Sequence, residues 1–121
     1  MKRILLAASV AFCGCSSFNE SEWNPRDTAL EVGFQVLNAY DAHTTQRIGK
    51  SATIEESAVL TRAVLGPKPG ANETAVYFAV SGLSHYLIGR SLPPKWRKWW
   101  QAGTIVYTGS LIDQNCDLGL C

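Results

Sequence analysis

Apolar residues recur with the period of an α-helix soon after the amino-terminal part of the chain. Four positions, spaced by four, three and four residues, share one side of such a helix: Leu30, Phe34, Leu37 and Asp41. A capping box, Thr28-Ala29-Leu30-Glu31, precedes most of this stripe. The pattern therefore predicts a first helix over about residues 28–46.

A second capping box, Thr53-Ile54-Glu55-Glu56, predicts a shorter helix further along the chain. We expect this helix to end at Gly66 and Pro67, because glycine is favoured just past a helix and proline cannot continue one. Residues 68–71 then form a loop.

Two further helices are predicted, one on each side of Pro93 and Pro94. Asn72 caps the first, whose body over residues 75–89 is almost wholly apolar, and the second covers about residues 95–114. Small residues would face each other between them: Ala75, Ala79, Gly82 and Gly89 against Gly103, Thr104, Thr108 and Ser110. The sequence thus predicts an all-α fold of three to four helices with a C-terminal antiparallel helical hairpin.

Each apolar body of this hairpin is about fifteen residues or roughly 22 Å long, short of a hydrocarbon core of roughly 30 Å. The hairpin therefore suits either a protein core or a membrane. Cations and tryptophans alternate where its second helix begins, as they do at a lipid headgroup layer: Trp96, Arg97, Lys98, Trp99 and Trp100. We favour headgroup contact, and a solvated turn with buried tryptophans is the alternative.

Length and composition narrow the class of protein. The 121 residues suffice for one domain, and 46% hydrophobic against 17% charged residues is too apolar for a disordered chain. The formal net charge of +1 argues against a non-specific nucleic-acid binder, so we expect no nucleic acid among the partners. The low content of charge favours contact with membrane lipids.

The amino terminus has the layout of a secretory signal. Two basic residues precede a largely apolar segment of nine residues at 4–12, which is too short to span a bilayer. The residues that follow, Gly14-Cys15-Ser16-Ser17, resemble the cleavage and lipidation site of bacterial lipoproteins. This resemblance implies cleavage after Gly14 and a diacylglyceryl group on the Cys15 thiol. An ordinary cleaved signal or an uncleaved anchor is the alternative.

By the same resemblance, residues 1–14 are a lipoprotein signal peptide, residues 15–26 a tether and residues 27–121 a small helical domain. Serines rather than aspartate follow Cys15, which favours an outer-membrane protein facing the periplasm over an inner-membrane one. Several acyl chains hold a lipoprotein stably on a membrane. The expected location is therefore the cell envelope, and the covalent lipid takes the place of any cofactor.

A larger part of the chain, over about residues 37–115, resembles a family of small helical proteins and lipoproteins encoded in proteobacteria and their phages. The matching positions include Asp41, His85, Leu92-Pro93-Pro94-Lys95-Trp96-Arg97, Gln101 and Asn115. The family's Glu-x-Asn-Pro element is missing here, where the chain reads Leu60-Thr61-Arg62-Ala63. The resemblance implies a helical architecture and membrane association, and it supplies no mechanism.

Three ionisable residues form a candidate polar site. Asp41 lies on the apolar stripe of the first helix, His85 within the most apolar helix, and Asp113 near the end of the last one. Such groups in apolar surroundings have shifted pKa values. We favour a hydrogen-bonded network that fixes the helix register, and a metal or proton-handling site is the alternative. The sequence lacks His-x-x-x-His, Glu-x-x-His and Gly-x-Ser-x-Gly motifs, so we assign no catalytic and no metal-binding residue.

Cys116 and Cys121 are the cysteines at the carboxyl end of the chain. In an oxidising periplasm they can close a small disulfide, and two thiols are the alternative.

Together these features predict a membrane-anchored bacterial or prophage lipoprotein that acts by binding and is not an enzyme. Its partner would be an envelope protein or the membrane, and its role a modification of the host surface such as limiting superinfection. The alternative is an integral membrane protein, or a small membrane-embedded enzyme with a polar or metal site around Asp41 and His85.

Overall fold

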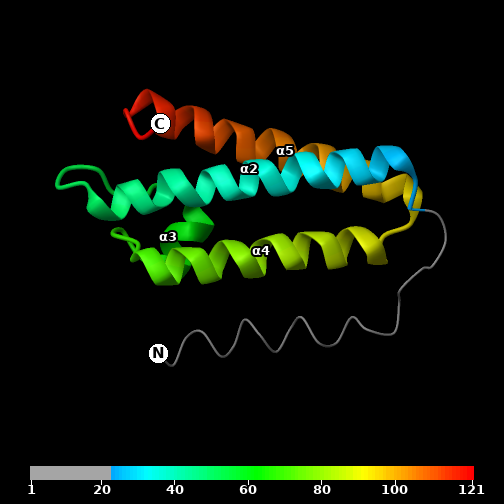
Figure 1. The fold of residues 1–121 in the computed structure, drawn as a ribbon, viewed down its shortest axis with the longest axis horizontal. Helices are drawn as coiled ribbons and strands as arrows, with labels where there is room; N and C mark the ends of the chain where they lie inside the picture. Colours follow the sequence, from blue (N-terminus) through cyan, green and yellow to red (C-terminus); the bar gives the residue numbers. More distant parts are fainter. Residues whose placement is uncertain (1–22) are drawn as a thin grey trace.

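The computed structural model describes residues 23–121, and this part of the chain contains helices and no strand (Figure 1). The helices are α2 (Pro25–Lys50), α3 (Val59–Leu65), α4 (Ala71–Ser91) and α5 (Pro94–Asp117). The predicted all-α class is confirmed. Gly14, Cys15 and most of the predicted tether lie outside the described residues.

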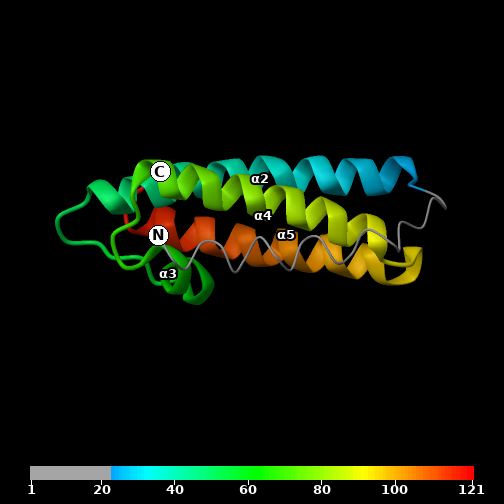
Figure 2. The same cartoon turned by 90° about the horizontal axis from the view of Figure 1, so that it is seen from below.

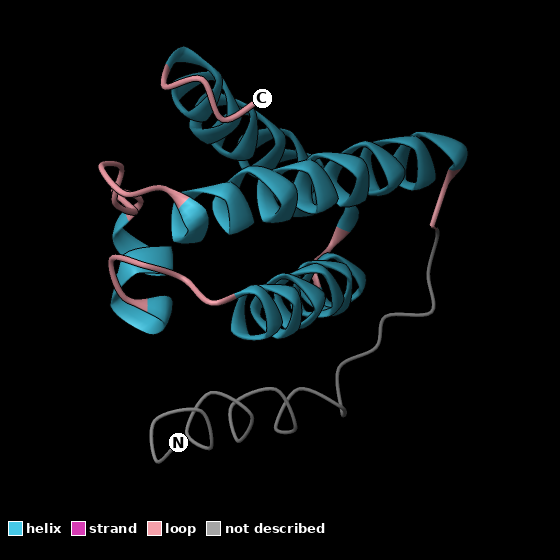
Figure 3. Cartoon of the chain, turned by 60° about the vertical axis from the view of Figure 1, so that its left-hand side comes forward, coloured by secondary structure: helices cyan, strands magenta, loops and turns pink. Residues whose placement is uncertain are grey.

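The three long helices lie side by side, and α4 runs antiparallel to α2 and α5 (Figures 1 and 2). Helix α2 contacts both α5 and α4 extensively, whereas α4 and α5 contact each other little. Helix α2 is therefore the central element, and Figure 3 shows the three long helices from a third direction. Short helix α3 lies at the end of the bundle where α2 ends and α4 begins (Figure 1).

Helices α4 and α5 follow each other across Leu92 and Pro93 and run in opposite directions (Figure 1). Of their predicted interface of small residues, Gly89 and Thr104 do contact the opposite helix, but Gly82 and Gly103 do not. A Cβ atom on Gly82 would lie 2.5 Å from Oε1 of Gln35 on α2, whereas one on Gly103 of α5 would meet nothing within 4 Å. The close approach that glycine allows at Gly82 therefore joins α4 to α2.

Helix α2 begins one turn earlier than predicted. The Asn24 side chain accepts a hydrogen bond from the backbone N–H of Asp27 at 2.9 Å, and the Asp27 carboxylate accepts one from that of Asn24 at 3.2 Å. This capping box replaces the predicted one at Thr28 and Glu31. The Glu31 carboxylate is consequently free to reach a neighbouring helix.

Helix α3 is shorter than predicted. The Glu56 side chain accepts a hydrogen bond from the backbone N–H of Ala58 at 2.8 Å, and the helix begins only at Val59. Its predicted end is confirmed, because Gly66 follows it with a φ of 81°, in the left-handed region that glycine adopts without strain.

The interior of the bundle is largely polar. Seven buried residues of α2 recur at the intervals of a heptad seam: Asp27, Glu31, Phe34, Asn38, Asp41, Thr45 and Ile48. Only Phe34 and Ile48 among them are apolar. The outer surface shows the opposite character, since Val36, Leu83 and Val106 are 64%, 60% and 72% exposed. Over residues 23–121, no helix combines the length and the hydropathy needed to cross a membrane.

Candidate functional site

Arg97 forms a buried ion pair at the end of the bundle where α2 and α5 begin. Its Nη1 lies 3.0 Å from Oδ2 of Asp27, and both side chains are almost fully buried. Its Nε donates to the carbonyl of Gly89 at 2.8 Å, and its Nη2 donates to that of Leu92 at 3.1 Å. Arg97 thus ties the starts of α2 and α5 to the end of α4.

The predicted membrane-interface residues therefore divide into two groups. Arg97 is buried, and Trp100 is half-buried with its indole N–H donating to the carbonyl of His85 at 3.2 Å. Trp96 and Trp99 are exposed, as is Lys98. The prediction of surface contact is wrong for Arg97, because the first turn of α5 turns this side chain toward Asp27 on α2.

His85 on α4 stands at the centre of a second buried network. Its Nδ1 lies 3.0 and 3.1 Å from the two carboxylate oxygens of Glu31 on α2, and its Nε2 lies 2.7 Å from the Thr104 hydroxyl on α5. The imidazole stacks on Phe34, with 3.5 Å between ring centroids. One side chain thus connects all three long helices.

Burial lowers the pKa of His85 below its usual 6.5, and the hydrogen bond and charge of Glu31 oppose this shift. A neutral imidazole whose Nδ1–H donates to Glu31 leaves Nε2 as an acceptor. The Thr104 hydroxyl beside Nε2 has one proton, for which the Trp100 carbonyl at 2.8 Å competes.

Glu31, His85 and Thr104 have the order of acid, imidazole and hydroxyl that catalytic triads use. Thr104 lies in the middle of α5, however, where backbone N–H groups donate within the helix and do not stabilise an oxyanion. Its hydroxyl also lies 2.8 Å from the carbonyl of Trp100. The arrangement is therefore suited to fixing the positions of three helices, in line with the favoured interpretation of His85.

Asp41 lies in a separate polar region. It is ten residues, or about 15 Å along a helix, beyond the histidine partner Glu31. Burial and then the charge of Glu56 raise the pKa of the Asp41 carboxyl to about 6, and a hydrogen bond from Thr45 opposes the shift. In the same turn, Thr44 accepts a hydrogen bond from Nδ2 of Asn115 at 2.9 Å.

The three residues of the candidate polar site are not brought together. His85 pairs with Glu31, Asp41 lies near Glu56, and Asp113 is exposed on α5. In the described part of the chain, no group of histidine, cysteine, aspartate and glutamate side chains is arranged to hold a metal ion.

The Cys116 and Cys121 sulfurs are joined in a disulfide. The backbone N–H of Leu120 donates to the carbonyl of Asn115 at 3.0 Å, and Nη1 of Arg47 on α2 lies 3.3 Å from the carbonyl of Cys121. The carboxyl end therefore folds back onto the end of α2.

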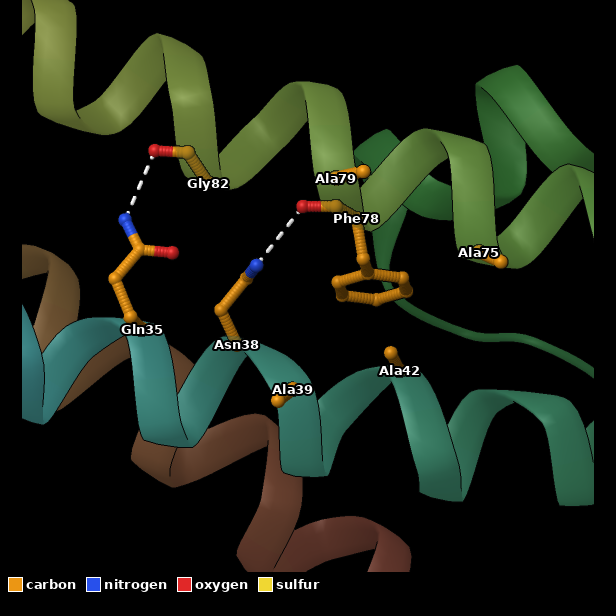
Figure 4. A pocket seen from close by; sticks show the side chains of 8 residues that line it. All are labelled: Gln35, Asn38, Ala39, Ala42, Ala75, Phe78, Ala79 and Gly82. Atoms are coloured by element: carbon orange, nitrogen blue, oxygen red, sulfur yellow. Dashed lines mark hydrogen bonds between the residues drawn. The ribbon is translucent and has the colours of Figure 1, made fainter.

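A shallow hollow between α2 and α4 is crossed by two side-chain amides (Figure 4). Gln35 donates to the carbonyl of Gly82, and Asn38 donates to that of Phe78, each at 2.9 Å. The rest of the lining is mostly alanine. These amides join the two helices, and the hollow offers no cluster of charged groups for a ligand.

The sequence analysis missed Glu31 and Gln101 as interior residues. Gln101 is fully buried, and its amide donates to the carbonyl of Asp27 at 3.0 Å. A signal for Glu31 was present, because polar residues recur on one side of the first helix at 27, 31, 38, 41 and 45.

No protein-family model, curated protein or solved structure matches the chain. The resemblances to bacterial lipoproteins and to the small helical family of phages therefore stay predictions.

Proposed function

We propose that this chain is an envelope lipoprotein, anchored through Cys15, whose helical bundle acts by binding at a membrane. The proposed location is the outer membrane, facing the periplasm, and the partners are membrane lipids or an envelope protein. In a prophage, such a protein would modify the host surface.

The observation that carries the proposal is the distribution of polarity in the bundle. Charged groups such as Arg97, Asp27 and Glu31 are satisfied inside, while large apolar side chains cover much of the outside. Extended exposed apolar surface on a folded protein is typical of a binding surface for protein or lipid. The Gly14-Cys15 pair supports the anchor.

An intact mass of the chain extracted from Gram-negative membranes tests the anchor. We expect a mass that lacks residues 1–14 and carries acyl groups. Cys15→Ala should abolish this modification, whereas Cys13→Ala is the matched control, since Phe12 rather than a small residue precedes Cys13. An unprocessed mass without acyl groups in the parent chain would refute the lipoprotein proposal.

Deletion and complementation test the role at the host surface. We expect cells that express the chain to adsorb phage less efficiently than cells that lack it. Complementation with Cys15→Ala should fail to restore the effect, because the bundle would no longer be held at the envelope. Equal adsorption in all strains, together with unchanged envelope integrity, would refute this role.

A further inference from the structure

Charged side chains are missing from the exposed middle of each long helix in the described chain. On α2 the charged residues between Arg26 and Arg47 are buried, on α4 there are none between Glu73 and Arg90, and α5 has none between Lys98 and Asp113. At 1.5 Å per residue, each stretch is roughly 20 to 30 Å long. Because the helices lie side by side, these stretches form one zone around the bundle (Figures 1 and 2).

We call this zone the apolar belt and define it by two exposed residues from each long helix: Val32, Val36, Val80, Leu83, Val106 and Tyr107. These residues come from helices that lie on different sides of the bundle (Figure 3). An interface with one second copy would cover only one side of such a belt and would leave the exposed valines and leucine of the other sides in water.

One end of the bundle has the composition of a membrane interface. All four tryptophans of the chain lie where α2 and α5 begin and α4 ends, together with four cations: Arg26, Arg90, Lys95 and Lys98. Among residues 23–121, the acidic residues of this end, Asp27 and Glu31, are buried against Arg97 and His85. The exposed charge that these described residues carry is therefore positive, which complements anionic lipid headgroups.

The interior adds an independent argument for lipid. A charged group in contact with hydrocarbon is strongly destabilising unless it is paired. Alongside the belt, the charged groups Arg97 and Asp27 pair with each other, and Glu31 faces His85, all of them away from the surface. The bundle can thus present apolar atoms to acyl chains while the polar groups of Asp27, Glu31 and Arg97 stay inside.

We infer that the apolar belt contacts the acyl chains of an anionic membrane, with the tryptophan end of the bundle at the headgroups. This inference rests on the proposed function for what brings the chain to a membrane, and it adds that the bundle itself is in contact with lipid.

Photo-crosslinking in vesicles tests the inference. The full chain, with the lipid it carries, is reconstituted into phosphatidylcholine and phosphatidylglycerol vesicles that contain a lipid with a diazirine on its acyl chain. After illumination, mass spectrometry locates the labelled residues. We expect labels within residues 32–36, 76–88 and 99–107 and none within residues 51–70, which lie outside the belt.

Two substitutions of exposed valines supply a matched pair. Val106→Asp introduces a charge into the belt and should lower labelling of residues 99–107 roughly tenfold. Val64→Asp introduces the same charge on α3, outside the belt, and should leave labelling unchanged. Both valines are more than half exposed, so neither substitution removes core packing.

The outcomes separate the inference from the proposed function. Chains that float with vesicles and carry acyl groups on Cys15, but show no label in the belt, would overturn the inference and leave the anchor in place. A belt protected from label by a cross-linked second copy would also overturn it. Label in the belt of a chain without acyl groups would support lipid contact and refute the anchor.

Discussion

His85 and Glu31 are 54 residues apart in the chain, and Nδ1 of the His85 imidazole lies 3.0 Å from Oε2 of the Glu31 carboxylate. This contact joins α4 to α2, and the Thr104 hydroxyl at 2.7 Å extends it to α5. A polar contact has stricter geometry than an apolar one, so it specifies one register among the helices. The interior of this bundle therefore favours specificity of packing over the area of apolar contact.

The ion pair between Arg97 and Asp27 should behave as a coupled unit. Arg97→Met leaves a buried carboxylate without its partner, and we expect the free energy of unfolding to fall by about 3 to 5 kcal/mol. The double substitution Arg97→Met with Asp27→Leu should cost clearly less than Arg97→Met alone, because no unpaired charge remains. Urea denaturation followed by circular dichroism measures the free energy of unfolding of the single and the double variant.

Lys50→Met is the control for this ion pair, since it removes an exposed cation from the last turn of α2. It should change the unfolding free energy by less than about 1 kcal/mol. If the double substitution proves as costly as the sum of its single changes, the two side chains are not coupled and the interpretation fails.

Two glycines in the middle of long helices should respond in opposite directions to alanine. Gly103→Ala adds a methyl group where nothing lies within 4 Å, so it should stabilise α5 by up to about 1 kcal/mol. Gly82→Ala places a methyl group 2.5 Å from Oε1 of Gln35, so the Gln35 side chain must move away. We expect this substitution to weaken the contact between α4 and α2 and to lower the stability of the protein. Thermal unfolding compares them, and equal shifts in Tm would contradict the close approach of α4 to α2.

Much of the fold follows from the sequence, and the composition of its interior does not. The predicted stripe of helix α2 does face the interior, since Phe34 and Asp41 are buried and Leu30 and Leu37 are partly buried. Polar residues such as Glu31 and Asn38 share this side of the helix. The general preference for apolar interiors gave no reason to expect them there.

The sequence also does not predict which polar residues of the interior pair with each other. Asp27 and Arg97 are separated by 70 residues, and Glu31 was predicted to belong to a capping box with Thr28, which suggested a local role. Only the arrangement of the helices brings these groups together. By contrast, Gly66 and the paired prolines act within a few residues, and the helix ends that they predict are confirmed.

The raised pKa of Asp41 makes stability depend on pH in the acidic range. The native carboxyl holds its proton up to a pH of about 6, whereas its usual pKa is 3.8. Its stabilising contribution is therefore complete below about pH 4 and is lost as the pH rises through 6, by an amount of the order of 2 to 3 kcal/mol. Urea denaturation at a series of pH values should show this loss.

Asp41→Asn keeps a similar shape and removes the proton equilibrium. We expect it to abolish the loss between pH 4 and 6 and to stabilise the protein at pH 7, because no charge has to be buried near Glu56. Asp113→Asn changes an exposed aspartate on α5 and is the matched control. Identical pH profiles for the parent and Asp41→Asn would contradict the role of burial.

His85 should act in the opposite sense. Its pKa is lowered in the native state, so the unfolded chain binds a proton more readily as the pH falls below 6.5. The neutral imidazole thus contributes stability that is present above pH 6.5 and is lost as the pH falls through the native pKa. Nuclear magnetic resonance of the ring, in the native protein and in urea, should show the native imidazole titrating at the lower pH.

His85→Gln tests whether this proton equilibrium is the cause. The amide can still donate to Glu31 but does not titrate, so the slope of unfolding free energy against pH should decrease below about pH 6.5. His43→Gln removes an exposed imidazole from the same protein without touching the interior, which makes it the matched control. A native imidazole that titrates at or above 6.5 would mean that the charge of Glu31 outweighs burial, and His85 would then be a buried cation paired with Glu31.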